Sequence, residues 1–111
     1  VVQALKGRNL NGKVLVTGQD GELAACQRIV AGDQTMTVWK PDNELSRLVI
    51  DACLKIVNGQ EPDINGSINN GVKDVPAVLV DPVPVGKDNM DSTIIAAGYY
   101  PKEDVYSKTA E

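Results

Sequence analysis

Two short apolar runs, each followed by a stretch of helical period, most constrain how this chain can fold. Residues 13–17 (KVLVT) are nearly continuous in apolar character, as in a strand buried on both faces of a parallel sheet. Residues 34–40 (QTMTVWK) are rich in β-branched side chains and predict a second strand. Helices are expected at about residues 22–31 and 43–57. This order predicts an α/β fold with parallel sheets flanked by helices.

Both expected helices carry terminal signals. On the first, Leu23, Cys26 and Val30 recur at helical spacing, and Gly32 follows as a C-terminal stop. Asp42 is expected to cap the N-terminus of the second. Apolar residues cover a wide arc of that second helix, so we expect it to be well covered. Its shared face comprises Leu45, Leu48, Val49, Ala52 and Ile56.

The remaining segments are less regular. Residues 1–5 suit the tail of a helix, and residues 63–74 suit a loop because they hold two Asn-Gly turn signals. Residues 75–85 carry three prolines, which predicts an edge strand or an irregular crossing. A short last helix is expected at residues 90–97, and residues 101–111 are expected to be loosely ordered. With only three expected strands, the edges of the sheet would have unpaired backbone groups, which is not typical of a complete independent domain.

Length and charge narrow the class of protein. The 111 residues suffice for one small core, and the formal net charge of -4 disfavours nucleic acid and anionic membranes as partners. No apolar run approaches the ~18 residues of a membrane helix. The chain opens with Val1, which we interpret as the start of a piece of a longer or processed product.

The residue types present argue against catalysis. Without histidine, Ser–His–Asp and Cys–His catalysis and every histidine-containing metal site are excluded. No glycine-rich phosphate loop occurs, and Ile68 stands where a calcium loop beginning at Asp63 would need glycine. Cys26 and Cys53 fit no zinc or disulfide framework and are expected to be small buried residues. We therefore expect no enzyme activity, no cofactor and no metal.

Polar side chains follow both expected strands. Ligands of open α/β sheets collect at the carboxyl ends of strands, where Asp20 and Lys40 stand. A carboxylate accepts hydroxyl hydrogen bonds and an ammonium donates them, so the pair suits adjacent sugar hydroxyls. Local sequence alone leaves other interpretations open. Asp20 also suits a helix cap, Lys40 a solvated charge, and Trp39 either a sugar-stacking ring or a buried or hinge-lining one.

Two longer segments carry a resemblance. These are KVLVTGQDGELAACQRIVAGDQTMTVWKP and INNGVKDVPAVLVDPVPVGKDNMDSTII. They resemble the C-terminal part of bacterial D-xylose-binding proteins, which are periplasmic sugar-binding proteins of the ribose/galactose type. The resemblance runs along nearly all of the chain, and the order GQD, helix, QTMTV-aromatic-KP, helix, NGQEP is specific to it.

The resemblance implies a two-lobed fold whose lobes close over a sugar. On that plan residues 1–40 belong to the second lobe, residues 41–76 cross into the first, and residues 77–111 form the return crossing and C-terminal segment. The two cysteines would then lie in different lobes and form no disulfide. The resemblance also implies that Asp20 and Lys40 bind the sugar, while Trp39 stands where relatives can carry another aromatic residue.

The function implied by the resemblance is extracytoplasmic binding of a pentose, with D-xylose as the expected sugar, for delivery to an ABC permease. An alternative is a sensor subunit that presents the loaded state to the extracellular domain of a histidine kinase. A rival class is the sugar-binding core of an intracellular repressor, which would need a DNA-binding headpiece upstream. The implied location is the periplasm, or the extracellular face of a Gram-positive host through a membrane anchor. The other partner would be the missing N-terminal part of the same protein.

Overall fold

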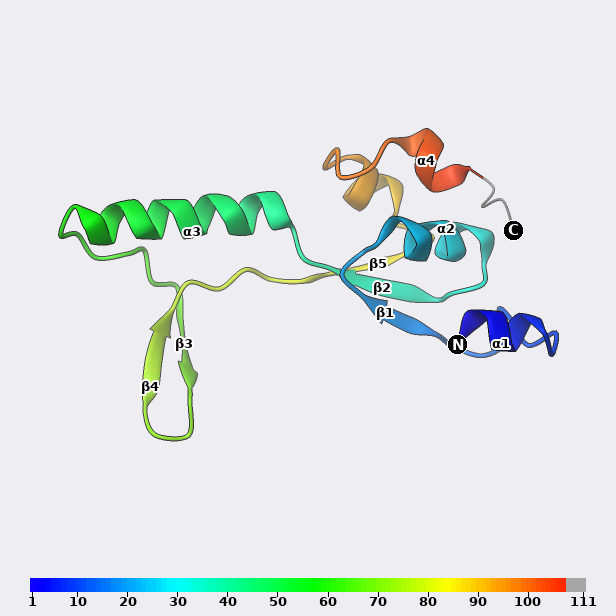
Figure 1. Ribbon diagram of the computed structural model, residues 1–111, viewed down its shortest axis with the longest axis horizontal. Helices are drawn as coiled ribbons and strands as arrows, with labels where there is room; N and C mark the ends of the chain where they lie inside the picture. The colour runs from blue at the N-terminus through cyan, green and yellow to red at the C-terminus, as the bar shows by residue number, and fades with distance from the viewer. Residues whose placement is uncertain (108–111) are drawn as a thin grey trace. The chain divides into compact units, whose positions relative to one another are not determined.

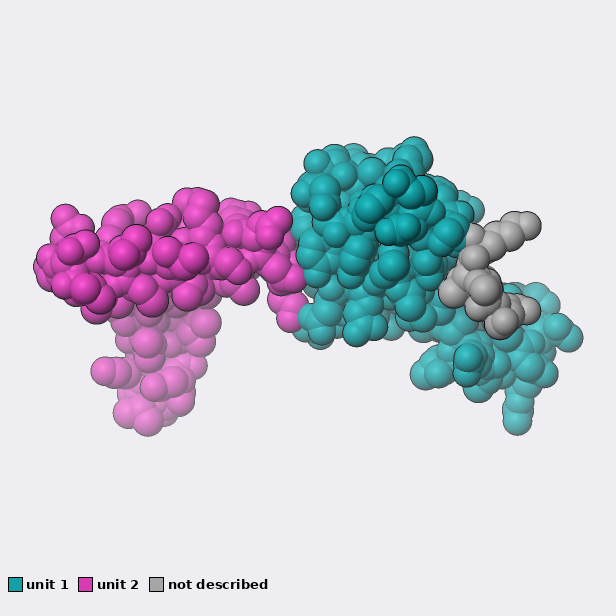
Figure 2. Space-filling model, turned by 45° about the horizontal axis from the view of Figure 1, so that its top comes forward, with its two compact units in different colours: residues 1–39, 82–111 teal, residues 40–81 magenta. Residues whose placement is uncertain are grey.

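The computed structural model describes residues 1–107 of the chain (Figure 1). The chain forms two compact units. The first joins residues 1–39 to the chain from Pro82 onward, and the second comprises Lys40–Asp81 (Figure 2). The chain therefore passes from one unit to the other after Trp39 and returns after Asp81.

The first unit is built on a three-stranded sheet in the order β1-β2-β5. Strand β1 (Thr17–Gln19) pairs in parallel with β2 (Met36–Trp39), as the two strand signals predicted. Strand β5 (Val83–Gly86) pairs antiparallel with β2, so the sheet is mixed. Because β5 is an edge strand, Pro84 costs the ladder little, and the edge position predicted from the prolines is confirmed for this strand.

The helices of the first unit are α1 (Val2–Lys6), α2 (Leu23–Ala31), a π-helical turn η1 (Asp91–Ile95) and α4 (Lys102–Tyr106). Figure 1 shows α2 and α4 close together beside the sheet, and the two helices are in contact. Helix α2 ends at Gly32 in the left-handed conformation, φ 85°, as predicted. The core between these elements consists of Cys26, Ile29, Trp39, Val85, Met90, Ile94 and Val105.

The first strand lies later in the chain than predicted. Residues 13–17 were expected to form it, but the pairing with β2 begins only at Thr17, opposite Met36. Before that point the Lys13 and Val14 amides donate to the Leu10 carbonyl, so this backbone is in a turn and not in the ladder. Leu15 is 82% exposed, and no strand pairs with the outer edge of β1 in the described residues.

The expectation that residues 101–111 are loosely ordered is wrong for the part that the structure describes. Helix α4 forms there, and Val105 is fully buried in the core. Burying one apolar side chain anchors a helix too short to be stable alone. Residues 108–111 of this expectation lie outside the described residues.

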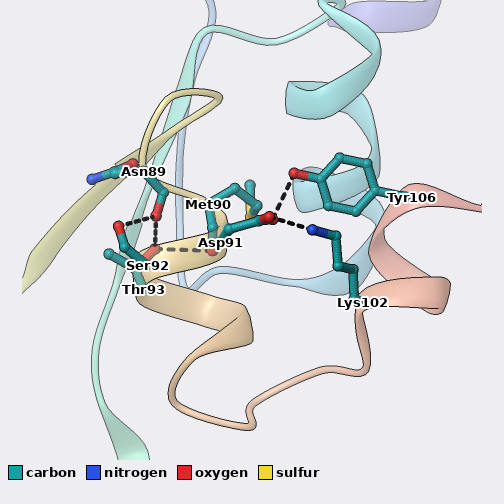
Figure 3. Close-up of polar contacts among 7 residues, drawn as sticks. All are labelled: Asn89, Met90, Asp91, Ser92, Thr93, Lys102 and Tyr106. Atoms are coloured by element: carbon teal, nitrogen blue, oxygen red, sulfur yellow. Dashed lines mark hydrogen bonds and ion pairs between the residues drawn. The ribbon is translucent and has the colours of Figure 1, made fainter.

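A polar cluster joins η1 to α4 (Figure 3). The Asp91 carboxylate accepts from the Tyr106 hydroxyl at 2.7 Å and pairs with the Lys102 ammonium, which lies 5.3 Å from the centre of the Tyr106 ring. Asn89, just before η1, accepts through its backbone carbonyl from the Thr93 hydroxyl at 2.6 Å. The Lys102 hydrogen bond holds the pKa of Asp91 below its usual range. This cluster therefore supports the docking of α4 at its exposed side.

A second polar contact holds the N-terminal segment to the end of α2. The Asp33 carboxylate pairs with Lys6 at 2.8 Å and accepts from the Asn11 side-chain amide at 2.8 Å. These hydrogen bonds, that of Lys6 first, lower the pKa of Asp33. A carboxyl whose folded pKa is depressed stabilises the fold above its unfolded pKa of about 3.9, and this contribution is lost as the pH falls through the folded pKa.

The substitution Asp33→Asn is expected to flatten the acid limb of the stability curve, because this carboxyl then no longer takes up a proton on unfolding. Chemical unfolding of the full-length protein from neutral pH to below about pH 3.9 tests this. Asp88→Asn, which changes an exposed acid in the turn after β5, is the matched control and should leave the slope nearly unchanged. An unaltered acid slope in the Asp33 variant would contradict the assignment.

The second unit contains α3 (Asp42–Val57) and a hairpin of β3 (Gly66–Asn69) and β4 (Asp74–Ala77). Residues 63–74 were expected to be a loop, and this is wrong because β3 lies within them. The turn signals themselves are real: the Asn70 side-chain oxygen accepts from the Lys73 amide at 3.0 Å and closes the hairpin.

Helix α3 differs from expectation in two respects. Pro41 occupies the N-cap, so Asp42 is the first helical residue and not the cap, although its charge still suits the positive end of the helix dipole. The helix was expected to be well covered, yet none of its residues is buried in the described structure. Cys53 is accordingly exposed, contrary to prediction, whereas Cys26 is buried as predicted. The described part of this unit has only a two-stranded sheet, which is too small to cover a helix of 16 residues.

Candidate functional site

The turn that follows β1 has an uncommon backbone. The Asp20 amide donates to the Val38 carbonyl at 2.7 Å, so the parallel pairing extends one residue beyond the strand. Asp20 then has φ 76° and Gly21 has φ 64°, two consecutive residues in the left-handed region. A non-glycine residue with positive φ is uncommon, and such conformations cluster at functional sites. The only other one among residues 1–107 is Asn9, in the turn after α1.

Two buried side chains form hydrogen bonds with the backbone of Gly21. Its amide donates to the Thr37 hydroxyl oxygen at 3.3 Å, and its carbonyl accepts from the Cys26 thiol, Sγ to O 3.5 Å. Thr37 and Cys26 are both fully buried. Burial raises the pKa of the Cys26 thiol, so the sulfur stays protonated and able to donate. Both backbone polar groups of Gly21 thus bond to side chains from neighbouring elements.

Trp39 packs against the same turn. It is the last residue of β2, it is 7% exposed, and its ring lies 5.5 Å from that of Tyr99 at 53°. A Cβ on Gly21 would lie 3.0 Å from Trp39 Cδ1, a tight contact that adds to the strain of a side chain at φ 64°, so glycine is favoured there. The indole nitrogen has no hydrogen-bond partner within the described part of the chain. Of the two interpretations of Trp39, the buried one is confirmed.

The predicted sugar ligands fall in different units. Asp20 is exposed and follows β1 in the first unit, and Lys40 is exposed and is the first residue of the second. Because β1 and β2 are parallel neighbours, each residue follows the carboxyl end of a strand in one sheet. Helix α2 takes Glu22 as its N-cap, so Asp20 is not the cap residue. Their joint role in binding a sugar stays a prediction.

Asp20 and Lys40 do not line either of two cavities found among residues 1–107. A cavity of about 780 Å³ in the first unit lies among α1, β1 and α2 and has Lys6, Glu22 and Arg28 in its wall. A smaller one of about 180 Å³ lies between α3 and the segments around Asp63 and Val78. Both residues are exposed where they follow their strands.

Two further features of residues 1–107 bear on metal binding and membrane insertion. No group of three or more acidic, cysteine or histidine side chains could hold a metal ion there. Over the same residues, no helix combines the length and the apolar character that a bilayer crossing requires.

Sequence reasoning did not identify Thr37, Cys26 or Gly21 as parts of the site. The period of two along β2, which puts Thr37 on the same face as Trp39, was a signal that Thr37 faces a protein interior. Its partner Gly21 lies 16 residues away in the sequence, and only the pairing of β1 with β2 brings the two together.

The comparison with protein families matches residues 1–61 to a periplasmic binding protein domain. The chain is 43% identical over 105 residues to a D-xylose-binding periplasmic protein of Haemophilus influenzae, covering 95% of this chain and 32% of that protein. It is 42% identical to the D-xylose-binding periplasmic protein of Escherichia coli K12, covering 94% and 32%. The chain thus spans about a third of the length of these relatives.

Solved structures agree with the family match. A carbohydrate transporter solute-binding protein from Chloroflexus aurantiacus, in complex with D-glucose, superposes with a TM-score of 0.77 at 42% identity, over 81% of this chain and 26% of that one. An ABC transporter solute-binding protein from Clostridium phytofermentans with bound β-D-glucose gives a TM-score of 0.74 at 30% identity, over 82% and 29%. The predicted α/β class and fold family are confirmed. The chain belongs to the periplasmic binding protein family and is homologous to the D-xylose-binding periplasmic proteins.

Proposed function

We propose that this chain is part of a two-lobed, non-enzymatic protein that binds a pentose outside the cytoplasm. D-Xylose is the expected sugar. The observation that carries this proposal is the identity of 42–43% to D-xylose-binding periplasmic proteins over nearly the whole chain. The division of the chain after Trp39 and Asp81 supports a plan in which residues 1–40 belong to the second lobe, residues 41–76 cross into the first, and residues 77–111 form the return crossing and the C-terminal segment.

In this proposal Asp20 and Lys40 bind the sugar hydroxyls. The Asp20 carboxylate accepts hydrogen bonds from two hydroxyls, and the Lys40 ammonium donates to a neighbouring oxygen. Three features support the assignment: both residues are exposed, both follow strands of the same parallel pair, and Asp20 has the positive φ that is frequent at functional sites. Charge-assisted hydrogen bonds of this kind are the strong ones in a neutral ligand's site.

Delivery of the sugar to an ABC permease is the proposed role in the cell. Two structural relatives are described as transporter solute-binding proteins, which supports this partner. Periplasmic relatives support a periplasmic location, with extracellular anchoring to the membrane as the form expected in a Gram-positive host. Closure of the lobes over the sugar would give the permease a surface that the open form lacks.

The sugar is tested by calorimetric titration of the full-length protein with D-xylose, D-glucose and D-ribose. D-Xylose is expected to bind at least about tenfold more tightly than D-glucose, or ~1.4 kcal/mol, because a closed pocket shaped for a pentose has no room for the extra hydroxymethyl group. Tighter binding of D-glucose would contradict the pentose assignment. Absence of binding to every sugar would contradict the proposed function itself.

A wider sugar range, joined to a sensory role, is the second candidate. The relative from Rhizobium radiobacter, a multiple sugar-binding periplasmic receptor, is 35% identical over 78% of this chain, and both solved neighbours hold glucose. On this alternative, the sugar-bound protein would bind the extracellular domain of a sensor kinase. Pull-downs with permease and sensor domains, with and without D-xylose, separate the two partners.

A further inference from the structure

We infer that Thr37 is a positioning residue for the sugar: its buried hydroxyl holds the Asp20–Gly21 turn in the conformation that presents the Asp20 carboxylate. This inference rests on the proposed function, since it concerns the same site. In this inference Thr37 acts on the sugar only through Asp20, and it lies on β2, the neighbour of the strand that Asp20 follows.

The hydrogen-bond arrangement carries the argument. The Gly21 amide donates to Thr37 Oγ1 at 3.3 Å, and Thr37 is 0% exposed. Without that hydroxyl, the amide has no acceptor in place and no free access to water, which is unfavourable for a buried donor. The Asp20 amide is bonded to Val38 on the same strand. Two successive amides of the turn are therefore tied to β2, one by the backbone and one by the Thr37 side chain.

The backbone conformation of the turn explains why the hydrogen bond to Thr37 matters. Asp20 has φ 76°, which is unfavourable because its Cβ is crowded in the left-handed region, whereas Gly21 at φ 64° carries no Cβ; the turn therefore needs contacts that hold Asp20 in place. Trp39 blocks one side of Gly21, but its indole nitrogen has no hydrogen-bond partner among residues 1–107. The Thr37 hydroxyl thus fixes the direction of the N–H of the peptide between Asp20 and Gly21.

Orientation matters for a carboxylate that must accept from hydroxyl groups. Such hydrogen bonds need oxygen–oxygen distances of about 2.5–3.0 Å and weaken steeply when the angle is poor. A change of φ or ψ at Asp20 moves its carboxylate away from both hydroxyls at once. Removal of the Thr37 hydroxyl should therefore weaken sugar binding through Asp20.

The test is a double-mutant cycle in the full-length protein, with D-xylose affinity measured by calorimetry and the melting temperature recorded for each variant. Thr37→Val keeps the shape and removes the acceptor, and is expected to weaken binding roughly fivefold to tenfold, as for loss of one neutral hydrogen bond. Thr37→Ser restores the hydroxyl and should recover most of the affinity. In an Asp20→Asn background, Thr37→Val should add less than about a twofold loss, because the group on which it acts is already disabled.

Thr35→Val is the matched control. Thr35 lies just before the same strand and its hydroxyl accepts from the Val16 amide at 3.0 Å, at the opposite end of the β1–β2 pair. This substitution also removes a bond from a backbone amide to a threonine hydroxyl, but an exposed one away from the Asp20 turn, so it should leave D-xylose affinity within about twofold of wild type. If Thr37→Val does not fold, Thr37→Ala takes its place in the same cycle.

The outcomes separate this inference from the proposed function. Equal losses from the Thr37 substitution in both backgrounds would overturn the positioning role while leaving the sugar site intact. Unchanged D-xylose affinity in Asp20→Asn alone would overturn the assignment of Asp20 to the sugar. A loss in Thr35→Val as large as that in Thr37→Val would show a general effect on the sheet and would also overturn the inference.

Discussion

Replacement of Asp20 or Lys40 by alanine in the full-length protein should weaken D-xylose binding by ~1.5–3 kcal/mol each, roughly 10- to 150-fold. This is the range for loss of a hydrogen bond to a charged group. Each substitution removes a charge that follows the carboxyl end of a strand in the β1–β2 pair, where ligands of α/β sheets bind. Titration calorimetry with D-xylose measures the loss.

The control is a pair of exposed charges in the first unit. Lys87 and Asp88 follow β5, whose last residue Gly86 pairs with Met36 at the start of β2. Because β5 is antiparallel to β2, Lys87 and Asp88 follow β5 beside the start of β2, at the end of the sheet opposite to the carboxyl ends of β1 and β2. Lys87→Ala and Asp88→Ala should keep wild-type affinity. Wild-type affinity in both Asp20→Ala and Lys40→Ala would rule out the proposed site.

Truncation of Ile29 should cause the largest loss of stability. Ile29 lies on α2, is 1% exposed and belongs to the buried core of the first unit. Ile29→Ala is expected to lower the free energy of unfolding by about 2–5 kcal/mol, because the lost burial adds to the cost of the remaining cavity. Ile29→Val, which removes one methyl group, should cost only about 0.5–1.5 kcal/mol.

Chemical unfolding of the full-length protein measures both changes. Val30→Ala on the same helix is the control, since Val30 is only half-buried and packs at the margin of the core. Its loss should be clearly smaller than that of Ile29→Ala. Equal losses at the two positions would mean that α2 does not pack in the way described here.

Elements defined by neighbouring residues could be predicted closely. Helix α2 was expected at about residues 22–31 and occupies Leu23–Ala31, because its apolar spacing and its terminal Gly32 are local signals. Strand β2 was expected within residues 34–40 and occupies Met36–Trp39. The edge position of β5 followed from the inability of proline to donate to a central ladder.

Elements defined by distant partners were missed. Residues 13–17 have the composition of a buried strand, yet the start of β1 depends on where β2 can pair with it. Helix α4 is too short to signal itself in the sequence and forms around the burial of Val105. Strand β3 of the hairpin contains residues of poor strand propensity and exists through its pairing with β4.

By itself, the sequence determined the α/β class, the helices with local end signals, and Asp20 and Lys40 as candidates, because the order of strand, polar residue and helix is written along the chain. Only the tertiary structure decided how Asp20 is held. Its turn depends on Thr37, 16 residues beyond Gly21, and on Cys26 and Trp39 packed behind it. A hydrogen bond between residues so far apart leaves no periodic pattern, since it arises only when two strands align and exclude water from between their side chains.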